Sequence, residues 1–170
     1  MKKKNIHLLT QAAMIAALYI VLTFIANAFG LANYSVQVRF SEALTILPFF
    51  TPAAIPGLFI GCLVSNILTG CAIPDIIFGS IATLIGALGT WKLRGSKNIF
   101  PGNVFLAPLP PILANTIIVP FVLRYAYGIR PLWLSFLTVG AGEIISCGIL
   151  GLLLAFTLNK YRSQIFRESF

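Results

Sequence analysis

Residues 34–65 read YSVQVRFSEALTILPFFTPAAIPGLFIGCLVS, and this stretch decides how the chain is organised. A charge pair, Arg39 and Glu42, stands at the mouth of a long apolar run that prolines interrupt at positions 48, 52 and 56. Proline lacks an amide donor and disfavours helix at the residue before it. The pattern therefore predicts two short helices joined by a turn at residues 51–56, with Pro56 or a near neighbour in the first turn of the second helix. We expect the charge pair to form the rim of a ligand site.

The composition is that of an integral membrane protein. Of the 170 residues, 58% are hydrophobic and 9% are charged, whereas a soluble domain carries about 25% charged residues. The apolar runs are continuous, which favours helices over the alternating strands of a β-barrel. They lie at 8–29, 43–68, 73–91, 104–123 and 132–158. We expect one membrane domain over residues 1–170, without a cleavable signal peptide.

The distribution of basic residues predicts the topology. If the run at 43–68 is split into two arms, both termini are cytoplasmic, and so are nine of the 12 lysines and arginines. If the run is one span, five of the 12 are cytoplasmic. The positive-inside rule therefore favours an all-α bundle of six transmembrane helices. Their approximate bounds are 8–29, 41–50, 54–70, 73–91, 103–124 and 132–158.

The net charge of +8 does not predict a nucleic-acid partner, because the basic residues flank apolar spans in short clusters. The lipid bilayer is the expected surrounding of the chain.

Three acidic residues, Glu42, Asp75 and Glu143, fall in the outer half of the membrane in this topology. A buried carboxylate is costly unless paired, so ionisable residues within membranes are candidates for function. Glu143 has apolar neighbours on both sides, and we favour ligand contact over an ion pair with one of the outer arginines, Arg39, Arg124 or Arg130. Glu42 and Asp75 each begin a helix, where an acid also interacts favourably with the helix dipole without any ligand.

Further candidates for ligand contact are Arg39, Asn115, Tyr34 and Trp133. Arg39 would orient the Glu42 carboxylate or meet the ligand itself. Asn115 lies in mid-helix, where a buried amide must find a partner on a neighbouring helix or on a ligand. Tyr34 and Trp133 flank the outer boundary, where an interfacial aromatic belt explains such residues equally well.

The first helix carries two overlapping pairs of small residues, Ala12 with Ala16 and Ala13 with Ala17. Small residues four apart allow close backbone approach between membrane helices. The pairs predict either ordinary packing inside the bundle or a docking face for another membrane subunit.

Signals for an enzyme are missing from the sequence. His7 is the only histidine and lies at the N-terminus, and no Gly-rich phosphate-binding loop is present. The three cysteines lack metal-ligand spacing, and we expect Cys62 and Cys147 to serve as small packing residues. We expect no catalysis, no cofactor and no metal. If nucleotide energises transport, the ATPase belongs to another polypeptide.

VQVRFSEALTILPFFTPAAIPGLFIGCLVSNI at 36–67 resembles the QueT family, and LAPLPPILANTIIVP at 106–120 and VGAGEIISCGILG at 139–151 extend the likeness. The resemblance implies a substrate-binding S component of an energy-coupling factor (ECF) transporter that imports queuosine precursors. It also implies a partner module of one transmembrane coupling subunit and two ATPases. The implied ligands are 7-deazaguanines such as queuine or 7-aminomethyl-7-deazaguanine.

The chemistry of such ligands fits the acidic residues. A guanine-like edge offers two adjacent donors to one carboxylate, and a second carboxylate would hold a cationic aminomethyl group. Glu143 and Glu42 are the leading pair, with their roles left open, and Arg39 or Asn115 would donate to the ligand carbonyl. The alternatives are a proton-coupled secondary transporter with Glu143 as the proton site and a membrane scaffold that does not transport.

Overall fold

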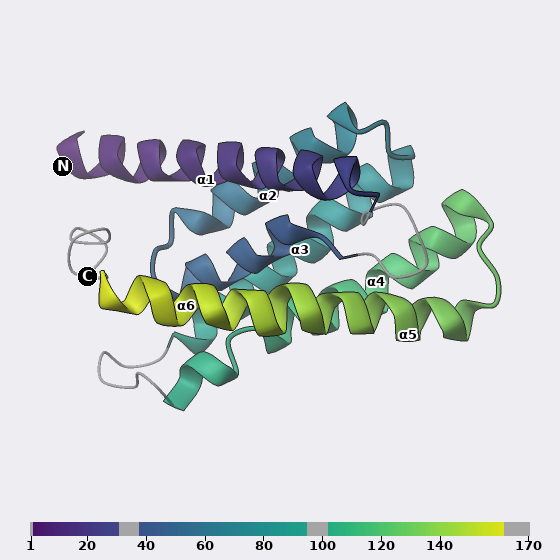
Figure 1. Ribbon diagram of the computed structural model, residues 1–170. Helices are drawn as coiled ribbons and strands as arrows, with labels where there is room; N and C mark the ends of the chain where they lie inside the picture. The colour runs from purple at the N-terminus through teal and green to yellow at the C-terminus, as the bar shows by residue number, and fades with distance from the viewer. Residues whose placement is uncertain (1, 31–37, 95–101, 162–170) are drawn as a thin grey trace.

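The chain is helical throughout the part that the structure, a computed structural model, describes: residues 2–30, 38–94 and 102–161 (Figure 1). Its elements in order are α1 (Lys2–Ala28), η1 (Phe40–Phe49), α2 (Ala54–Leu68), α3 (Ile73–Leu93), η2 (Gly102–Phe105), α4 (Leu109–Tyr127), α5 (Leu132–Glu143), η3 (Ile144–Leu150) and α6 (Gly151–Lys160). Elements η1 and η2 are 3₁₀-helices, and η3 is a π-helical stretch that joins α5 and α6 into one long helix. The predicted all-α class is confirmed.

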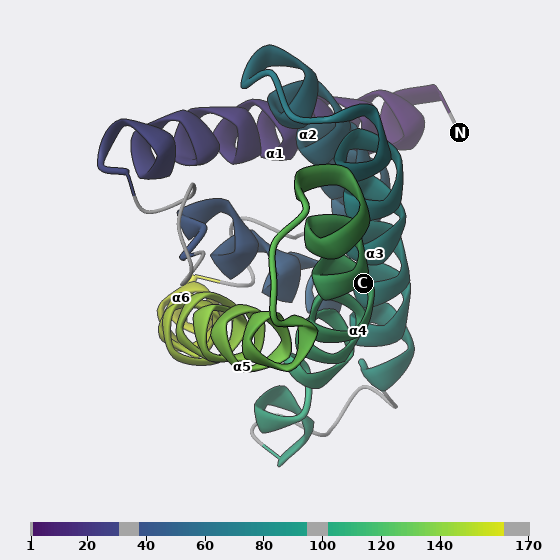
Figure 2. The same cartoon turned by 90° about the vertical axis from the view of Figure 1, so that its right-hand side faces the viewer.

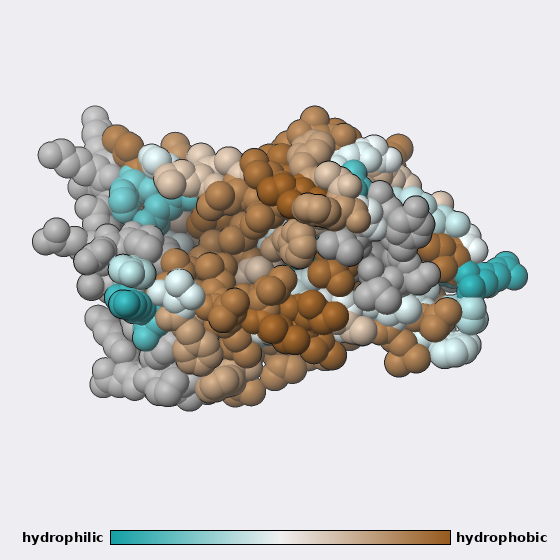
Figure 3. Space-filling model, in the orientation of Figure 1, coloured by the Kyte–Doolittle hydropathy of each residue, from teal (hydrophilic) through white to brown (hydrophobic). Residues whose placement is uncertain are grey.

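Within the described part of the chain, four helical segments are long and apolar enough to cross a bilayer: Asn5–Ala28, Ile73–Leu93, Leu109–Tyr127 and Leu132–Lys160. Elements η1 and α2 are also apolar but shorter. The visible surface is apolar across its middle and more polar toward both ends (Figure 3). The start of α1 and the end of α6 lie at the same end of the bundle (Figure 1).

The 3₁₀-helix η1 occupies the centre of the bundle (Figure 2). It packs against α1, α2, α3, η3 and α6, and eight of its ten residues are buried. A 3₁₀-helix of this length is unusual, since runs longer than three or four residues are uncommon. Pro48 lies inside it and supplies no amide donor. Element η1 is thus enclosed by the other helices on nearly all sides.

The break predicted from the prolines is present. The chain leaves helical conformation after Phe49, and α2 begins at Ala54. Thr51 organises the turn, because its hydroxyl accepts from the Ala53 amide at 3.3 Å and its carbonyl accepts from the Ala54 amide at 3.2 Å. Pro56 falls in the first turn of α2, where a missing N–H leaves no hydrogen bond unmade.

Two expected helices differ from those observed. The helix expected from residue 103 begins at Leu109, after the separate turn of η2. Prolines at 108, 110 and 111 explain the later start, because proline is best accommodated in the first turn of a helix. The helix expected at 132–158 contains the π-helical stretch η3, which starts directly after Glu143. Such insertions are frequent at functional sites.

Glycines in α2 let α1 approach closely. A Cβ at Gly57 would lie 2.7 Å from the Ala12 carbonyl oxygen, and a Cβ at Gly61 would lie 3.2 Å from the Ala16 Cα. Ala12 and Ala16 are buried accordingly. Internal packing, one of the two interpretations of the alanine pairs, therefore holds for these two residues.

A close contact between α3 and α4 generates a stability prediction. A Cβ at Gly86 would lie 2.6 Å from the Cα of Pro111, so Gly86→Ala forces the two helices apart. Overpacking of this kind costs about 1–3 kcal/mol. We expect a lower melting temperature for the purified protein in detergent. Gly148→Ala is the matched control, since its nearest new contact would be 3.8 Å away. Equal melting of the two variants would contradict the close packing.

Candidate functional site

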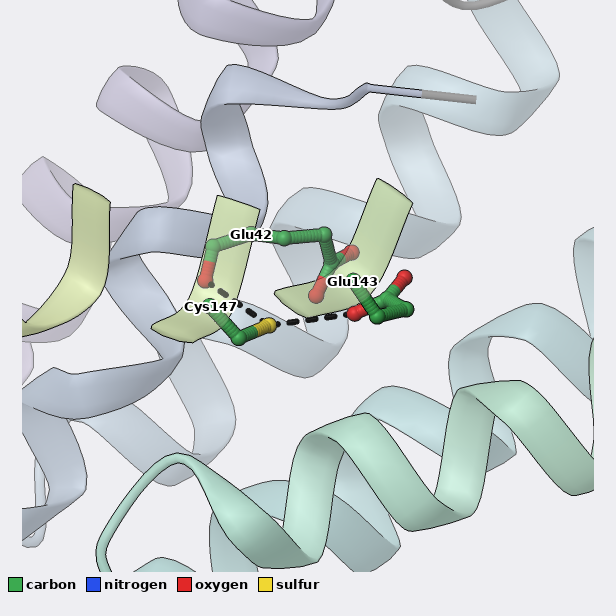
Figure 4. Close-up of side chains that lie close together, drawn as sticks. All are labelled: Glu42, Glu143 and Cys147. Carbon is green, nitrogen blue, oxygen red and sulfur yellow. Dashed lines mark hydrogen bonds between the residues drawn. The ribbon is translucent and has the colours of Figure 1, made fainter. Parts of the chain in front are cut away.

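Two carboxylates from separate elements meet in the interior. Glu42 lies in the first turn of η1 and Glu143 is the last residue of α5. Figure 4 shows them beside Cys147 of η3, and one donor atom from each of the three residues lies within 4.8 Å of the other two. All three are buried, with exposed fractions of 2%, 6% and 1%. The Cys147 thiol donates to Glu143 Oε2 at 3.1 Å and to the Glu42 carbonyl at 3.5 Å.

The Glu42 carboxylate is oriented from two further helices. The Tyr19 hydroxyl of α1 donates to Oε1 of Glu42, and the Asn115 amide of α4 donates to Oε2 at 3.4 Å. Both donors are buried. The hydroxyl of Thr45 donates to the Glu42 carbonyl at 2.6 Å and thereby holds the backbone as well. The orientation of Glu42 therefore depends on side chains from α1, η1 and α4.

The two carboxylates lack a paired cation among the described residues. Arg39 lines the same cavity and is half-buried, but its guanidinium forms no ion pair or hydrogen bond there with Glu42 or Glu143. The alternative in which Glu143 forms a structural ion pair is thus not seen within residues 2–30, 38–94 and 102–161. Two carboxylates face one guanidinium, so the site is suited to a ligand that brings positive charge and hydrogen-bond donors.

The cavity between these groups is small. It measures about 10 Å³, which is room for about one water molecule, whereas ligand pockets usually hold about 300–1,000 Å³. A bicyclic ligand therefore requires the surrounding helices to separate. Its lining combines the charged and amide groups with small and apolar side chains: Arg39, Glu42, Gly79, Thr83, Asn115, Val119, Val139 and Glu143.

The remaining predicted site residues lie elsewhere. Asp75, at the start of α3, is buried but does not line the cavity, and it accepts a hydrogen bond of 3.1 Å from the Tyr127 hydroxyl. It borders the site through Gly79, where a Cβ would lie 3.3 Å from Asp75 Oδ1. Trp133 is 63% exposed and lies outside the cavity lining, and its contact with a ligand stays a prediction. Tyr34 lies outside the described residues.

A second and larger concavity runs along α1. It measures about 720 Å³ and is almost wholly apolar. We call it the α1 groove; α1 contributes Asn5, Leu8, Leu9, Ala12, Ala13, Ala16, Ala17 and Ile20, and the turn and α2 contribute Pro52, Ala53, Pro56 and Ile60. Ala13 and Ala17 are exposed, unlike Ala12 and Ala16. The four alanines thus divide into a buried pair and an exposed pair on adjoining faces of α1.

Sequence reasoning missed Tyr19 and Cys147 as members of the site. Cys147 lies four residues after Glu143, so the two side chains share one helix face. The Cys147 thiol donates to the Glu143 carboxylate across one turn. Tyr19 places a hydroxyl group in the middle of an apolar helix, and a buried tyrosine hydroxyl usually finds a hydrogen-bond partner. Both signals are present in the sequence. The cysteines were assessed only for metal-ligand spacing and packing, and Tyr34 and Trp133 for an interfacial aromatic belt. Neither criterion identifies these two contacts.

Glu42, Glu143 and Cys147 offer one metal-ligating atom each. Structural zinc sites use four such ligands, so these three residues alone do not complete one. The expected absence of a metal stays a prediction.

Comparison with known proteins places the chain. A family model described as "QueT transporter" matches residues 9–160, which is most of the sequence. The chain belongs to the QueT family. Within the family, the Queuosine precursor transporter QueT of Lactococcus lactis subsp. cremoris (strain MG1363) is 34% identical over 85 residues, 50% of each chain. The match therefore spans about half the length of that relative. No solved structure matches the chain.

Membership of the QueT family confirms the suspected resemblance. A family of transporters also confirms that the protein is not an enzyme. Together with the four long apolar helices, it identifies the chain as a membrane protein.

The carboxylate pair generates a second stability prediction. Glu143→Gln keeps the side-chain shape and removes one of two neighbouring buried charges. We therefore expect the free energy of unfolding of the ligand-free protein to rise by about 1 kcal/mol. Asn115→Asp at the same cavity adds a third carboxyl group and is expected to destabilise the protein. Melting temperatures in detergent measure both effects. A lower melting temperature for Glu143→Gln would show that Glu143 is compensated in the folded protein.

Proposed function

We propose that this QueT family member is the substrate-capture subunit of an ECF-type importer and binds a queuosine precursor from outside the cell. The observation that supports this most strongly is the pair of buried carboxylates, Glu42 and Glu143, without a paired cation in the described part of the chain. The ligand is queuine or another 7-deazaguanine such as 7-aminomethyl-7-deazaguanine. The curated relative carries the name of a queuosine precursor transporter.

A cationic 7-deazaguanine complements the site on each side. Its guanine-like edge presents two adjacent N–H groups, which one carboxylate accepts in bidentate fashion, and its ammonium group needs a second carboxylate. Asn115 and Arg39 supply donors on the cavity wall for the ligand carbonyl. A neutral purine would leave one of the two carboxylates buried without a charged partner, which disfavours its binding.

The hydrogen bonds support different proposed roles for the two carboxylates. Both oxygens of Glu42 already accept from neutral donors, Tyr19 and Asn115, so this carboxylate is held ready for a planar edge. Glu143 accepts from the Cys147 thiol, a weak donor. We therefore assign the guanine-like edge to Glu42 and the ammonium group to Glu143.

The orientation in the membrane follows from charge. We propose six transmembrane helices in the bacterial plasma membrane, with both termini cytoplasmic, which leaves nine of the 12 basic residues inside. The positions of the start of α1 and the end of α6, at one end of the bundle, support this arrangement (Figure 1). The carboxylate site then opens from the outer half, whereas the α1 groove lies in the inner half.

The α1 groove is the proposed contact with the transmembrane coupling subunit, which two ATPases drive. The exposed pair Ala13 and Ala17 allows a partner helix to approach the α1 backbone closely, where association depends on van der Waals packing. The absence of a Gly-rich phosphate loop from the sequence is consistent with ATPases on other chains.

The carboxylate pair also supports a second candidate, a proton-coupled secondary transporter in which Glu143 takes up the proton. That protein would drive uptake in liposomes that contain this chain alone, whereas a capture subunit would not. A scaffold that does not transport is the third candidate. No small ligand would raise its melting temperature.

Ligand binding tests the proposed function directly. We expect calorimetry on the purified chain to show stoichiometric binding of 7-aminomethyl-7-deazaguanine without ATP. Glu143→Gln should weaken binding by at least about 30-fold, because loss of one partner of a buried charge pair costs about 2 kcal/mol or more. Guanine, which lacks the ammonium group, should bind weakly to both proteins. Absence of binding by any 7-deazaguanine would refute the proposed function.

The groove is tested by substitution on its exposed pair. We expect Ala13→Trp to abolish assembly with the coupling module and uptake, with ligand binding retained, because the new side chain fills the groove. Met14→Trp is the matched control, since Met14 is 61% exposed and does not line the groove. Ala16→Trp should impair ligand binding as well, because Ala16 packs against Gly61. Loss of ligand binding in Ala13→Trp would instead mean that Ala13 serves internal packing.

A further inference from the structure

We infer that Tyr19 is a positioning residue that links occupancy of the carboxylate site to the shape of the α1 groove. The inference rests on the proposed function, because it concerns the ligand and the partner surface proposed above. Its basis is that one short stretch of α1 contributes to both places. The groove is lined by Ala16, Ala17 and Ile20, and Tyr19 stands between them on the adjoining buried face.

Tyr19 reaches the ligand site directly. Its hydroxyl donates to Oε1 of Glu42, and the side chain is 1% exposed. Among residues 2–30, 38–94 and 102–161, no other side chain of α1 forms a hydrogen bond with Glu42 or Glu143. A change in the hydrogen bonds of Glu42 therefore reaches α1 through this contact.

The ring of Tyr19 cannot move independently of the helices around it. A Cβ at Gly61 would lie 2.8 Å from the Tyr19 Cβ and 3.1 Å from Cγ, so α2 lies directly against the base of the ring. Displacement of the hydroxyl from Glu42 must then shift α1 relative to η1 and α2. These are the elements on which the groove is built, since Pro52, Ala53 and Pro56 form its opposite wall.

A ligand provides the force for such a shift. A guanine-like edge presents two adjacent N–H donors that engage both oxygens of the Glu42 carboxylate at once, whereas the Tyr19 hydroxyl engages only Oε1. The ligand thus competes with Tyr19 for Glu42, and it interacts differently with the two positions of α1, which is what a population shift requires. Because binding linkage is reciprocal, a partner in the groove must change ligand affinity by the same factor, typically about 5- to 150-fold.

Other contacts between α1 and η1 supply a control. The Thr23 hydroxyl of α1, one turn beyond Tyr19, donates to the Tyr19 backbone carbonyl at 2.8 Å and lies 2.9 Å from the Ser41 hydroxyl of η1, without touching a carboxylate. Thr23→Val therefore weakens the attachment of α1 to η1 to a comparable degree and leaves the hydrogen bonds of Glu42 unchanged. If the link passes through Tyr19, Tyr19→Phe breaks it and Thr23→Val does not.

The experiment places an environment-sensitive fluorophore on Ala17→Cys in the groove of the full chain in nanodiscs. Cys71 is replaced by serine, since it is the one cysteine that is not buried. We expect saturating 7-aminomethyl-7-deazaguanine to shift the emission of this protein and of its Thr23→Val form. Tyr19→Phe should lose the shift and still bind the ligand in calorimetry. Gly61→Ala, which keeps the hydroxyl and displaces the ring, should also lose the shift.

The outcomes are separable. No binding in the parent protein refutes the proposed function and the inference with it. Binding without an emission shift refutes the inference alone, as does a shift that persists in Tyr19→Phe. Equal loss in Thr23→Val and Tyr19→Phe would also overturn it, because general attachment of α1, rather than Tyr19, would then carry the signal. If Tyr19→Phe does not fold, the result for Gly61→Ala decides in the same way.

Discussion

Burial of the Glu42 carboxylate at the centre of an apolar bundle is the constraint on which the structure depends. An ionised group in such surroundings is costly unless hydrogen bonds and opposite charge compensate for lost water. Tyr19 and Asn115 donate to its two oxygens from α1 and α4, and Thr45 secures its carbonyl. The position of the carboxylate thus determines which faces of α1, η1 and α4 turn inward.

The conformation of η1 follows from the same constraint. A ten-residue 3₁₀-helix is less favourable than an α-helix, yet it spans the bundle centre between the acidic site and the turn at 50–53 that borders the α1 groove. Proline at 48 prevents regular α-helical bonding, and burial on nearly all sides holds the segment in place. Element η1 therefore connects the carboxylate site with the α1 groove, the two surfaces proposed to bind the ligand and the partner.

Much of this organisation is readable from the sequence, for identifiable physical reasons. Prolines act locally, so the break before α2 was predictable, and the continuous apolar runs predicted the helical class. Glu42, Glu143, Asn115 and Arg39 were identified individually because polar groups stand out in apolar segments, and the structure brings them to one cavity. Two features depend on tertiary contacts: the 3₁₀ form of η1 and the recruitment of Tyr19 by Glu42. Propensity says little about either, because the partner in each case lies on another element.

The alanines of α1 show why one sequence pattern supports two interpretations. Helical geometry places Ala12 and Ala16 on one face and Ala13 and Ala17 about 100° further round, so the two pairs meet different neighbours. The first pair packs on Gly57 and Gly61, and the second pair lies open in the groove. Packing by the first pair therefore leaves the second pair accessible for the proposed docking. The buried pair brings α1 close enough to α2 for Tyr19 to reach Glu42, and the same approach shapes the groove beside it.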